Sequence, residues 1–126
     1  MINHISIGVL DIARARHFYD AVLKPLDYRR LSEGDGSLGY GRGEVSLWIS
    51  AVERPVPADE RSGLHICFNA PSADSVDRFH GAALAAGGSD NGKPGFRDDY
   101  ARDYYAAFVV DPDGYRIEAY CGPTTA

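Results

Sequence analysis

Three residues of metal-ligand type lie in short stretches in which polar and apolar side chains alternate. His65 lies in residues 64–69, and His4 and Glu118 lie in similar stretches near the two ends of the chain. Alternation with a period of two is typical of a strand with one buried face, so each residue would stand on the polar face. Two imidazoles and a carboxylate can hold a divalent cation and leave about three octahedral positions open for a substrate.

We therefore predict that His4, His65 and Glu118 bind one divalent metal ion. These ligand types do not distinguish Fe²⁺, Mn²⁺, Ni²⁺ and Zn²⁺. Such an ion can bind a substrate through two adjacent oxygens and stabilise negative charge that develops on them. The alternative is that both histidines are ordinary strand residues and Glu118 is a solvated carboxylate.

An internal repeat favours the metal hypothesis over that alternative. When His65 is aligned with His4, the same offset places Phe79 on Phe18 without a gap. Duplication of one structural unit explains such a match. His17 and His80 fall within the two predicted helices, and we expect both to be surface groups.

Each repeat begins with a strand, continues with a helix and ends with further strands. Asp11 and Ser72 are good helix N-caps, while Pro25 and the Gly87–Gly88 pair would end the two helices. The sequence predicts an α+β fold of two βαβββ modules in a single domain, with module 1–50, linker 51–62 and module 63–126. Further strands are expected at residues 26–33, 37–42, 44–50, 104–110 and 115–121, and a loop at residues 89–103.

Composition excludes several classes of protein. The chain has 126 residues and a net charge of −5, without a basic run, which argues against a nucleic-acid partner. Its apolar runs are shorter than the ~20 residues of a membrane span, and no signal peptide is evident. Two cysteines do not make a disulfide framework, so we expect a reduced, cytoplasmic protein without a membrane partner.

The stretches INHISIGVLDIARARHFYDAVL and AAFVVDPDGYRIEAY resemble the vicinal oxygen chelate superfamily. This superfamily includes glyoxalase I, extradiol dioxygenases, fosfomycin-resistance enzymes and bleomycin-binding proteins. The resemblance implies a glyoxalase-like half-barrel of mixed sheet with helices outside. It also implies that His4, His65 and Glu118 are the metal ligands, with Glu118 in the catalytic centre. Single-domain members usually form homodimers, so His4 of one subunit would join His65 and Glu118 of the other.

The chain departs from glyoxalase I in residues 45–50. Glyoxalase I has a carboxylate on the corresponding strand, whereas this stretch contains neither a carboxylate nor an imidazole, and Glu44 comes too early. A set of two histidines and one glutamate is similar to that of the dioxygenases and fosfomycin-resistance enzymes. The departure weakens the expectation of glyoxalase I activity.

Aromatic and basic residues are candidates for substrate binding. Trp48, Phe108 and Tyr120 would form pocket walls if their strands have the expected phase, with core packing as the equal alternative. The charged loop 93–102 can serve as a lid in which Lys93, Arg97 or Arg102 binds an anionic group, with an ordinary solvated loop as the alternative. Tyr104 can stack on a planar ligand or transfer a proton.

The leading hypothesis is a metal-dependent lyase, isomerase or transferase that acts on a small substrate chelated through adjacent oxygens. One alternative is a binding protein without catalysis, similar to the bleomycin-sequestering members. Another is an extradiol-type dioxygenase, which would consume oxygen together with a catechol.

Overall fold

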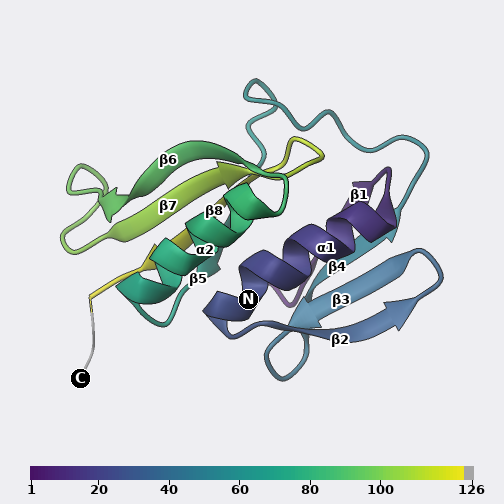
Figure 1. Cartoon of the computed structure of the whole chain (residues 1–126), viewed down its shortest axis with the longest axis horizontal. Coiled ribbons are helices and arrows are strands. Elements are labelled where there is room, and N and C mark those ends of the chain that lie inside the picture. Colours follow the sequence, from purple (N-terminus) through teal and green to yellow (C-terminus); the bar gives the residue numbers. More distant parts are fainter. Residues whose placement is uncertain (124–126) are drawn as a thin grey trace.

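The computed structural model describes residues 1–123, so residues 124–126 of the predicted second module lie outside the described part. The chain folds into two units of the same element order (Figure 1). The first contains β1 (Ile5–Val9), α1 (Ile12–Leu23), the short 3-10 helix η1 (Lys24–Leu26), β2 (Arg29–Gly34), β3 (Ser37–Gly41) and β4 (Val45–Ala51). The second contains β5 (His65–Asn69), α2 (Ala73–Ala85), β6 (Ser89–Phe96), β7 (Tyr105–Val110) and β8 (Arg116–Cys121).

Each unit forms its own four-stranded mixed sheet. The strand order is β1-β4-β3-β2 in the first sheet and β5-β8-β7-β6 in the second. In both sheets the first and last strands of the unit pair in parallel, and the other pairs are antiparallel. The predicted α+β fold of two βαβββ modules is therefore confirmed.

The two helices join the units through buried faces that the repeat predicts. Phe18 on α1 and Phe79 on α2 are both fully buried, and the helices pack against each other. The predicted caps are present: Asp11 accepts a hydrogen bond from the Arg14 amide, and Ser72 accepts one from the Ser75 amide. Local sequence signals thus set the start of each helix, and the apolar faces position one unit against the other.

The predicted loop at residues 89–103 is wrong in its first half, because residues 89–96 form β6. This edge strand contains Pro94 and two glycines and pairs only with β7, so it lacks the alternating apolar pattern of a half-buried strand. The strand expected at residues 26–33 also begins later, at Arg29. Pro25 lies in η1, and Asp27 adopts a left-handed conformation with φ of 66° before the strand starts.

His80 is buried rather than at the surface, with only 8% of its area exposed. Its Nε2 lies 2.8 Å from Oδ1 of Asp90, which stands on β6. This hydrogen bond lowers the pKa of the Asp90 carboxyl. His17 is exposed, as expected.

Cys67 and Cys121 are free thiols. Among residues 1–123, neither helix combines the length and the apolar character that crossing a bilayer requires.

Gly88 follows α2 and lies in close contact with Phe18 of α1 and Val110 of β7. A Cβ atom there would lie 2.7 Å from Cε1 of Phe18 and 2.9 Å from the Val110 carbonyl oxygen. We expect Gly88→Ala to reduce the free energy of unfolding by about 1–3 kcal/mol, because a rigid core accommodates extra volume poorly. Gly81→Ala is the matched control: its Cβ would meet nothing within 4 Å, and it should stabilise α2 by about 0.5–1 kcal/mol. Urea denaturation measures both, and equal effects would contradict the packing argument.

Candidate functional site

The register of β5 against β8 brings the first candidate residues together. The two strands are parallel, and Cys67 pairs with Glu118. Side chains of directly paired residues lie on the same face of a sheet, and so does a residue two positions away. His65 therefore lies on the same face as Glu118.

Glu118 is a buried carboxylate with both oxygens engaged. The residue is only 3% exposed. Its Oε1 lies 2.7 Å from Nε2 of His65, and its Oε2 accepts a hydrogen bond from the Tyr104 hydroxyl. The His65 side chain is 42% exposed, so the imidazole lies between the buried carboxylate and the solvent.

A cavity of about 550 Å³ opens over this pair. Its volume is in the range of about 300–1,000 Å³ that small-molecule sites occupy. Besides His65 and Glu118, the lining residues are Asn91, Gly92, Arg97, Tyr100 and Phe108. The cavity thus combines a carboxylate, an imidazole, a guanidinium and aromatic surfaces.

Aromatic rings form one side of the cavity. The Phe108 ring lies 5.8 Å from that of His65 and 6.3 Å from that of Tyr100. Phe108 pairs with Glu118 across β7 and β8, which places it on the same sheet face. Gly92 opposes it on β6, where a Cβ would lie only 2.9 Å from the Phe108 ring. A larger residue at Gly92 would therefore displace the ring.

Arg97 supplies positive charge at the edge of the cavity. Its guanidinium carbon lies 5.4 Å from the centre of the Phe108 ring. Its Nη2 donates a hydrogen bond of 2.5 Å to the Lys93 carbonyl oxygen. The side chain is thereby held beside the aromatic ring, where the guanidinium is suited to an anionic ligand group.

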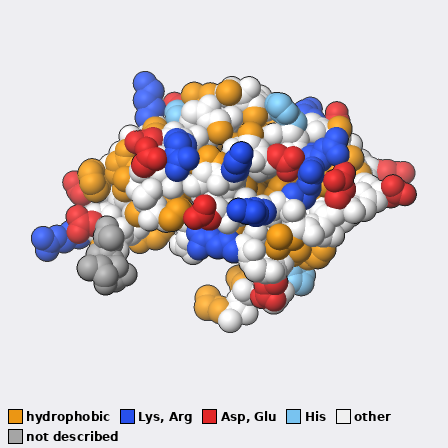
Figure 2. All heavy atoms as spheres, turned by 60° about the horizontal axis from the view of Figure 1, so that its bottom comes forward, with side chains coloured by type: hydrophobic (Ala, Val, Ile, Leu, Met, Phe, Trp, Pro, Cys, Tyr) orange, Lys and Arg blue, Asp and Glu red, His pale blue; other side chains and the backbone are white. Residues whose placement is uncertain are grey.

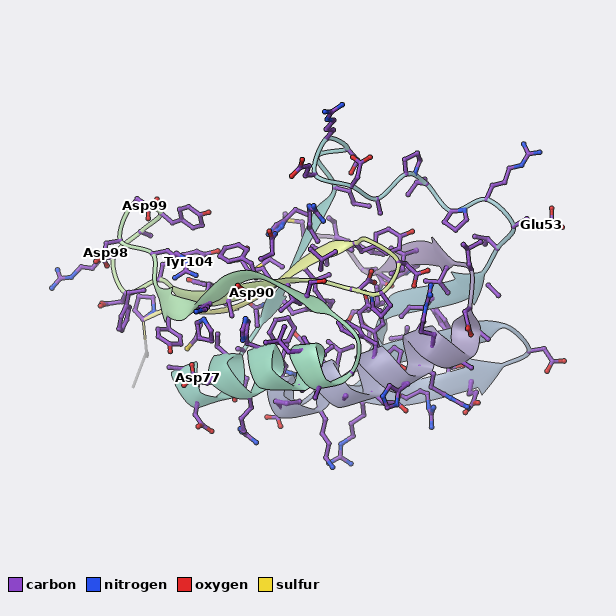
Figure 3. The ribbon with its side chains drawn as sticks, turned by 45° about the horizontal axis from the view of Figure 1, so that its top comes forward. Glu53, Asp77, Asp90, Asp98, Asp99 and Tyr104 are labelled. Carbon is purple, nitrogen blue, oxygen red and sulfur yellow. The ribbon has the colours of Figure 1, made fainter. Side chains whose placement is uncertain are left out.

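Tyr104 and Tyr120 stand beside the cavity and are not among its lining residues. Their ring centres are 4.2 Å apart, so Tyr120 packs on the ring whose hydroxyl reaches Glu118. Figure 3 shows Tyr104 at the end of the second sheet, near the hairpin that carries Asp98 and Asp99. Tyr120 therefore positions Tyr104.

One thiol and one phenol near Glu118, those of Cys67 and Tyr104, remain protonated at neutral pH. Desolvation raises the pKa of Tyr104, and its hydrogen bond to Glu118 raises it further. Desolvation and the nearby Glu118 carboxylate raise the pKa of Cys67 to about 12. Tyr104 is thus a hydrogen-bond donor to Glu118, and the Cys67 thiol is a poor nucleophile.

The structure does not place His4 and Trp48 in this site. His4 directly precedes β1, is exposed, and has its Nδ1 2.7 Å from Oδ1 of Asn3. Trp48 pairs with Ser6 on β1, in the first sheet. Within residues 1–123 no three His, Cys, Asp or Glu side chains are close enough to hold a metal ion. One chain therefore brings together two of the three predicted ligands.

The two residues that do meet fit a divalent cation. An imidazole nitrogen and a carboxylate oxygen converge at the cavity, and both are ligand types of first-row transition metals. The burial of Glu118 favours a positively charged partner, since an isolated buried carboxylate is costly.

Sequence reasoning missed Asn91 and Gly92 as lining residues. Both lie on β6, which was expected to be loop, and neither position follows an alternating apolar pattern. No signal in the sequence distinguishes them from other residues of a polar loop. Tyr100 and Arg97 lie in the predicted lid, whose charge and length did indicate a role at the site.

Comparisons with known proteins agree with this architecture. A family model described as Glyoxalase/Bleomycin resistance protein/Dioxygenase superfamily matches residues 1–119. A glyoxalase/bleomycin resistance protein from Albidiferax ferrireducens is 32% identical, with a TM-score of 0.83 over 94% of this chain and 97% of that one. The fosfomycin resistance protein FosX from Mesorhizobium loti shares the fold at 20% identity, with a TM-score of 0.72 over 99% of this chain and 94% of that one.

A relative from Bacillus subtilis, the uncharacterised protein YqjT, is 27% identical over an alignment of 125 residues that covers 92% of this chain and 94% of that protein. The family match covers the first βαβββ unit and the second as far as residue 119 in β8, and it includes His4, His65 and Glu118. The chain belongs to the glyoxalase/bleomycin resistance protein/dioxygenase superfamily.

Proposed function

We propose that this protein is a metal-dependent enzyme that acts on a small molecule bound through two adjacent oxygen atoms. The observation that carries the proposal is the His65–Glu118 pair beside a cavity of small-molecule size. His65 and Glu118 would hold a divalent ion, with Fe²⁺, Mn²⁺, Ni²⁺ and Zn²⁺ as the candidates. A bound ion would act as a Lewis acid that polarises substrate oxygens. Lyase, isomerase and transferase reactions all use this kind of stabilisation.

We further propose that a second copy of the chain completes the site. Two protein ligands are fewer than such an ion usually has. His4 is the third of the three ligands that the sequence predicts. His4 and Trp48 both belong to the first unit, whereas His65 and Glu118 belong to the second. A homodimer with twofold symmetry would bring the first sheet of one copy to the second sheet of the other, at two equivalent sites.

The cavity residues have distinct roles in this proposal. Tyr104 donates a hydrogen bond to Oε2 of Glu118 and so fixes the orientation of the carboxylate. Arg97 binds an anionic group of the substrate, while Phe108 and Tyr100 contact its apolar part and reduce the access of water. These contacts orient the substrate before the reaction.

Metal analysis of protein purified without chelator tests the proposal. The wild type should retain close to one divalent ion per chain, and His65→Ala should retain less than about a tenth of that amount, because a direct ligand is lost. His17→Ala is the matched control, since His17 is an exposed histidine on α1. Equal metal content in the wild type and His65→Ala would exclude the proposed site.

The aromatic side of the cavity supports a second candidate, a binding protein without catalysis. The centre of the Phe108 ring lies 5.8 Å from that of His65 and 6.3 Å from that of Tyr100. These rings can stack on a planar ligand. This candidate predicts ligand binding that survives both EDTA and His4→Ala. The enzyme proposal predicts that either treatment abolishes turnover.

A further inference from the structure

A second and larger cavity lies away from His65 and Glu118, where the two units meet. Its volume is about 710 Å³. It is formed by the end of α1, by η1, by the segment that leads into the start of β2, and by one residue each of β3 and α2. We call it the basic cavity. Its lining residues are Asp20, Ala21, Lys24, Pro25, Asp27, Tyr28, Arg29, Arg30, Tyr40 and Arg78.

Cationic side chains outnumber carboxylates in the basic cavity. Four of the lining residues are Lys or Arg and two are Asp, although the whole chain carries a net charge of −5. The face turned forward in Figure 2, which is the lower side of Figure 1, shows Lys and Arg side chains across its middle, with Asp and Glu side chains among them. The charge of this cavity is therefore a local feature opposite to that of the whole protein.

The positive charge is only partly neutralised by protein carboxylates. Within residues 1–123, neither Lys24 nor Arg29 forms an ion pair. Arg78 pairs at 2.9 Å with Asp74, one turn earlier on α2, but both side chains are more than half exposed. Exposed pairs of this kind contribute little, so Arg78 can exchange Asp74 for a ligand anion.

One of the two lining carboxylates is already engaged. Asp20 accepts a hydrogen bond of 2.8 Å from the Tyr40 hydroxyl and lies 3.2 Å from Nη1 of Arg30. Asp20 and Arg30 thus neutralise each other. Lys24, Arg29 and Arg78 remain as three cations against two carboxylates, those of Asp27 in the cavity and of Asp74 in its exposed pair with Arg78.

The wall of the basic cavity is held in place by packing. The Tyr28 ring lies 6.0 Å from that of Phe68, and the guanidinium of Arg42 lies 4.8 Å above it. Arg42 in turn donates a hydrogen bond of 3.1 Å to the Leu26 carbonyl oxygen. Tyr28 therefore presents a fixed aromatic edge beside the cations, suitable for the organic part of a ligand.

We propose that the basic cavity binds a small organic diphosphate. Lys24 and Arg29 of the first unit and Arg78 of the second would contact the phosphate oxygens, and Tyr28 would contact the organic group. The volume admits such a molecule. The bound ligand would bridge the two units, and this site is independent of the proposed metal site.

Isothermal titration of the full chain with pyrophosphate tests this proposal. We expect measurable binding of pyrophosphate, weaker binding of inorganic phosphate, and loss of affinity as salt increases. The double variant Lys24→Gln/Arg29→Gln should bind pyrophosphate roughly tenfold more weakly, as expected for the loss of two partly exposed charge contacts. The variant Arg54→Gln/Arg61→Gln removes the same charge from two exposed arginines outside the cavity and should bind like the wild type.

Two further measurements separate this cavity from other sites. Pyrophosphate bound at the proposed metal site would depend on Glu118, whereas pyrophosphate bound in the basic cavity would not. Glu118→Gln should therefore leave pyrophosphate binding unchanged. Vesicles containing phosphatidylglycerol should not bind the protein. The proposal is overturned if the two double variants weaken binding equally, if Glu118→Gln abolishes binding, or if only vesicles bind, which would assign the cations to a lipid headgroup.

Discussion

Glu118→Gln is expected to lower the affinity for the divalent ion at least about a hundredfold. Loss of a residue that merely supports a ligand costs about 10–100-fold, and a direct ligand should cost more. Glutamine keeps the shape of the side chain, so the effect would come mainly from the lost negative charge. The amide oxygen can still accept the hydrogen bond from Tyr104, but the amide NH₂ would then face Nε2 of His65, the atom expected to bind the metal.

Metal per chain, measured after gel filtration, checks this expectation. Glu44→Gln is the matched control, because Glu44 is an exposed carboxylate near the strand where glyoxalase I has an additional ligand. The control should keep the wild-type metal content. Loss of metal in Glu44→Gln with retention in Glu118→Gln would show that the carboxylate ligand had been assigned to the wrong residue.

Mixing two defective variants tests whether the site is shared between subunits. His4→Ala and Glu118→Gln should each lack metal by themselves. After subunit exchange in equal amounts, about half of the dimers would be mixed, and each mixed dimer would have one intact site. The mixture should therefore regain about a quarter of the wild-type metal. No recovery, despite proven exchange, would contradict a shared site.

Asp111→Ala is expected to reduce the free energy of unfolding by about 3–5 kcal/mol. Asp111 is 4% exposed, and its Oδ2 accepts a hydrogen bond of 2.5 Å from the hydroxyl of Tyr19, which is 1% exposed. Its Oδ1 accepts hydrogen bonds from the amides of Asp113 and Tyr115, at 2.9 and 2.8 Å. Alanine would leave these donors without their partner, and each unsatisfied buried donor costs about 1–3 kcal/mol.

Urea denaturation of three variants checks this assignment. Asp111→Asn keeps an acceptor for the turn amides and should cost less than Asp111→Ala. Glu53→Ala removes an exposed carboxylate between β4 and β5 and should lie within about 0.5 kcal/mol of the wild type. If Asp111→Ala is as stable as Glu53→Ala, the hydrogen bonds of Asp111 do not support the fold.

Elements with strong local signals were predictable. α1 and α2 begin at the capping residues Asp11 and Ser72, because a side-chain acceptor there satisfies a free amide of the first turn. The alternation of β5 and β8 placed His65 and Glu118 on polar strand faces, as the structure shows. In contrast, β6 was missed because an edge strand with little buried surface needs no apolar alternation and is held by its pairing with β7.

The same dependence on distant partners explains the error at His80. A histidine on a helix surface is usually solvated, but β6 covers this one and places Asp90 within 2.8 Å of its Nε2. Without β6, the sequence offers no reason to bury His80. The lining residues Asn91 and Gly92 were missed for the same reason.

The sequence by itself determined the order of the elements other than β6, the internal repeat and the types of the three candidate ligands, because hydrophobic period, caps and residue chemistry are local properties. Only the tertiary structure decided which ligands meet within one chain. The parallel register of β5 and β8 joins His65 to Glu118, while β1 holds the region of His4 in the other sheet. Strand pairing and helix packing between distant segments set the distances between the predicted ligands. No local residue pattern along the chain specifies these distances.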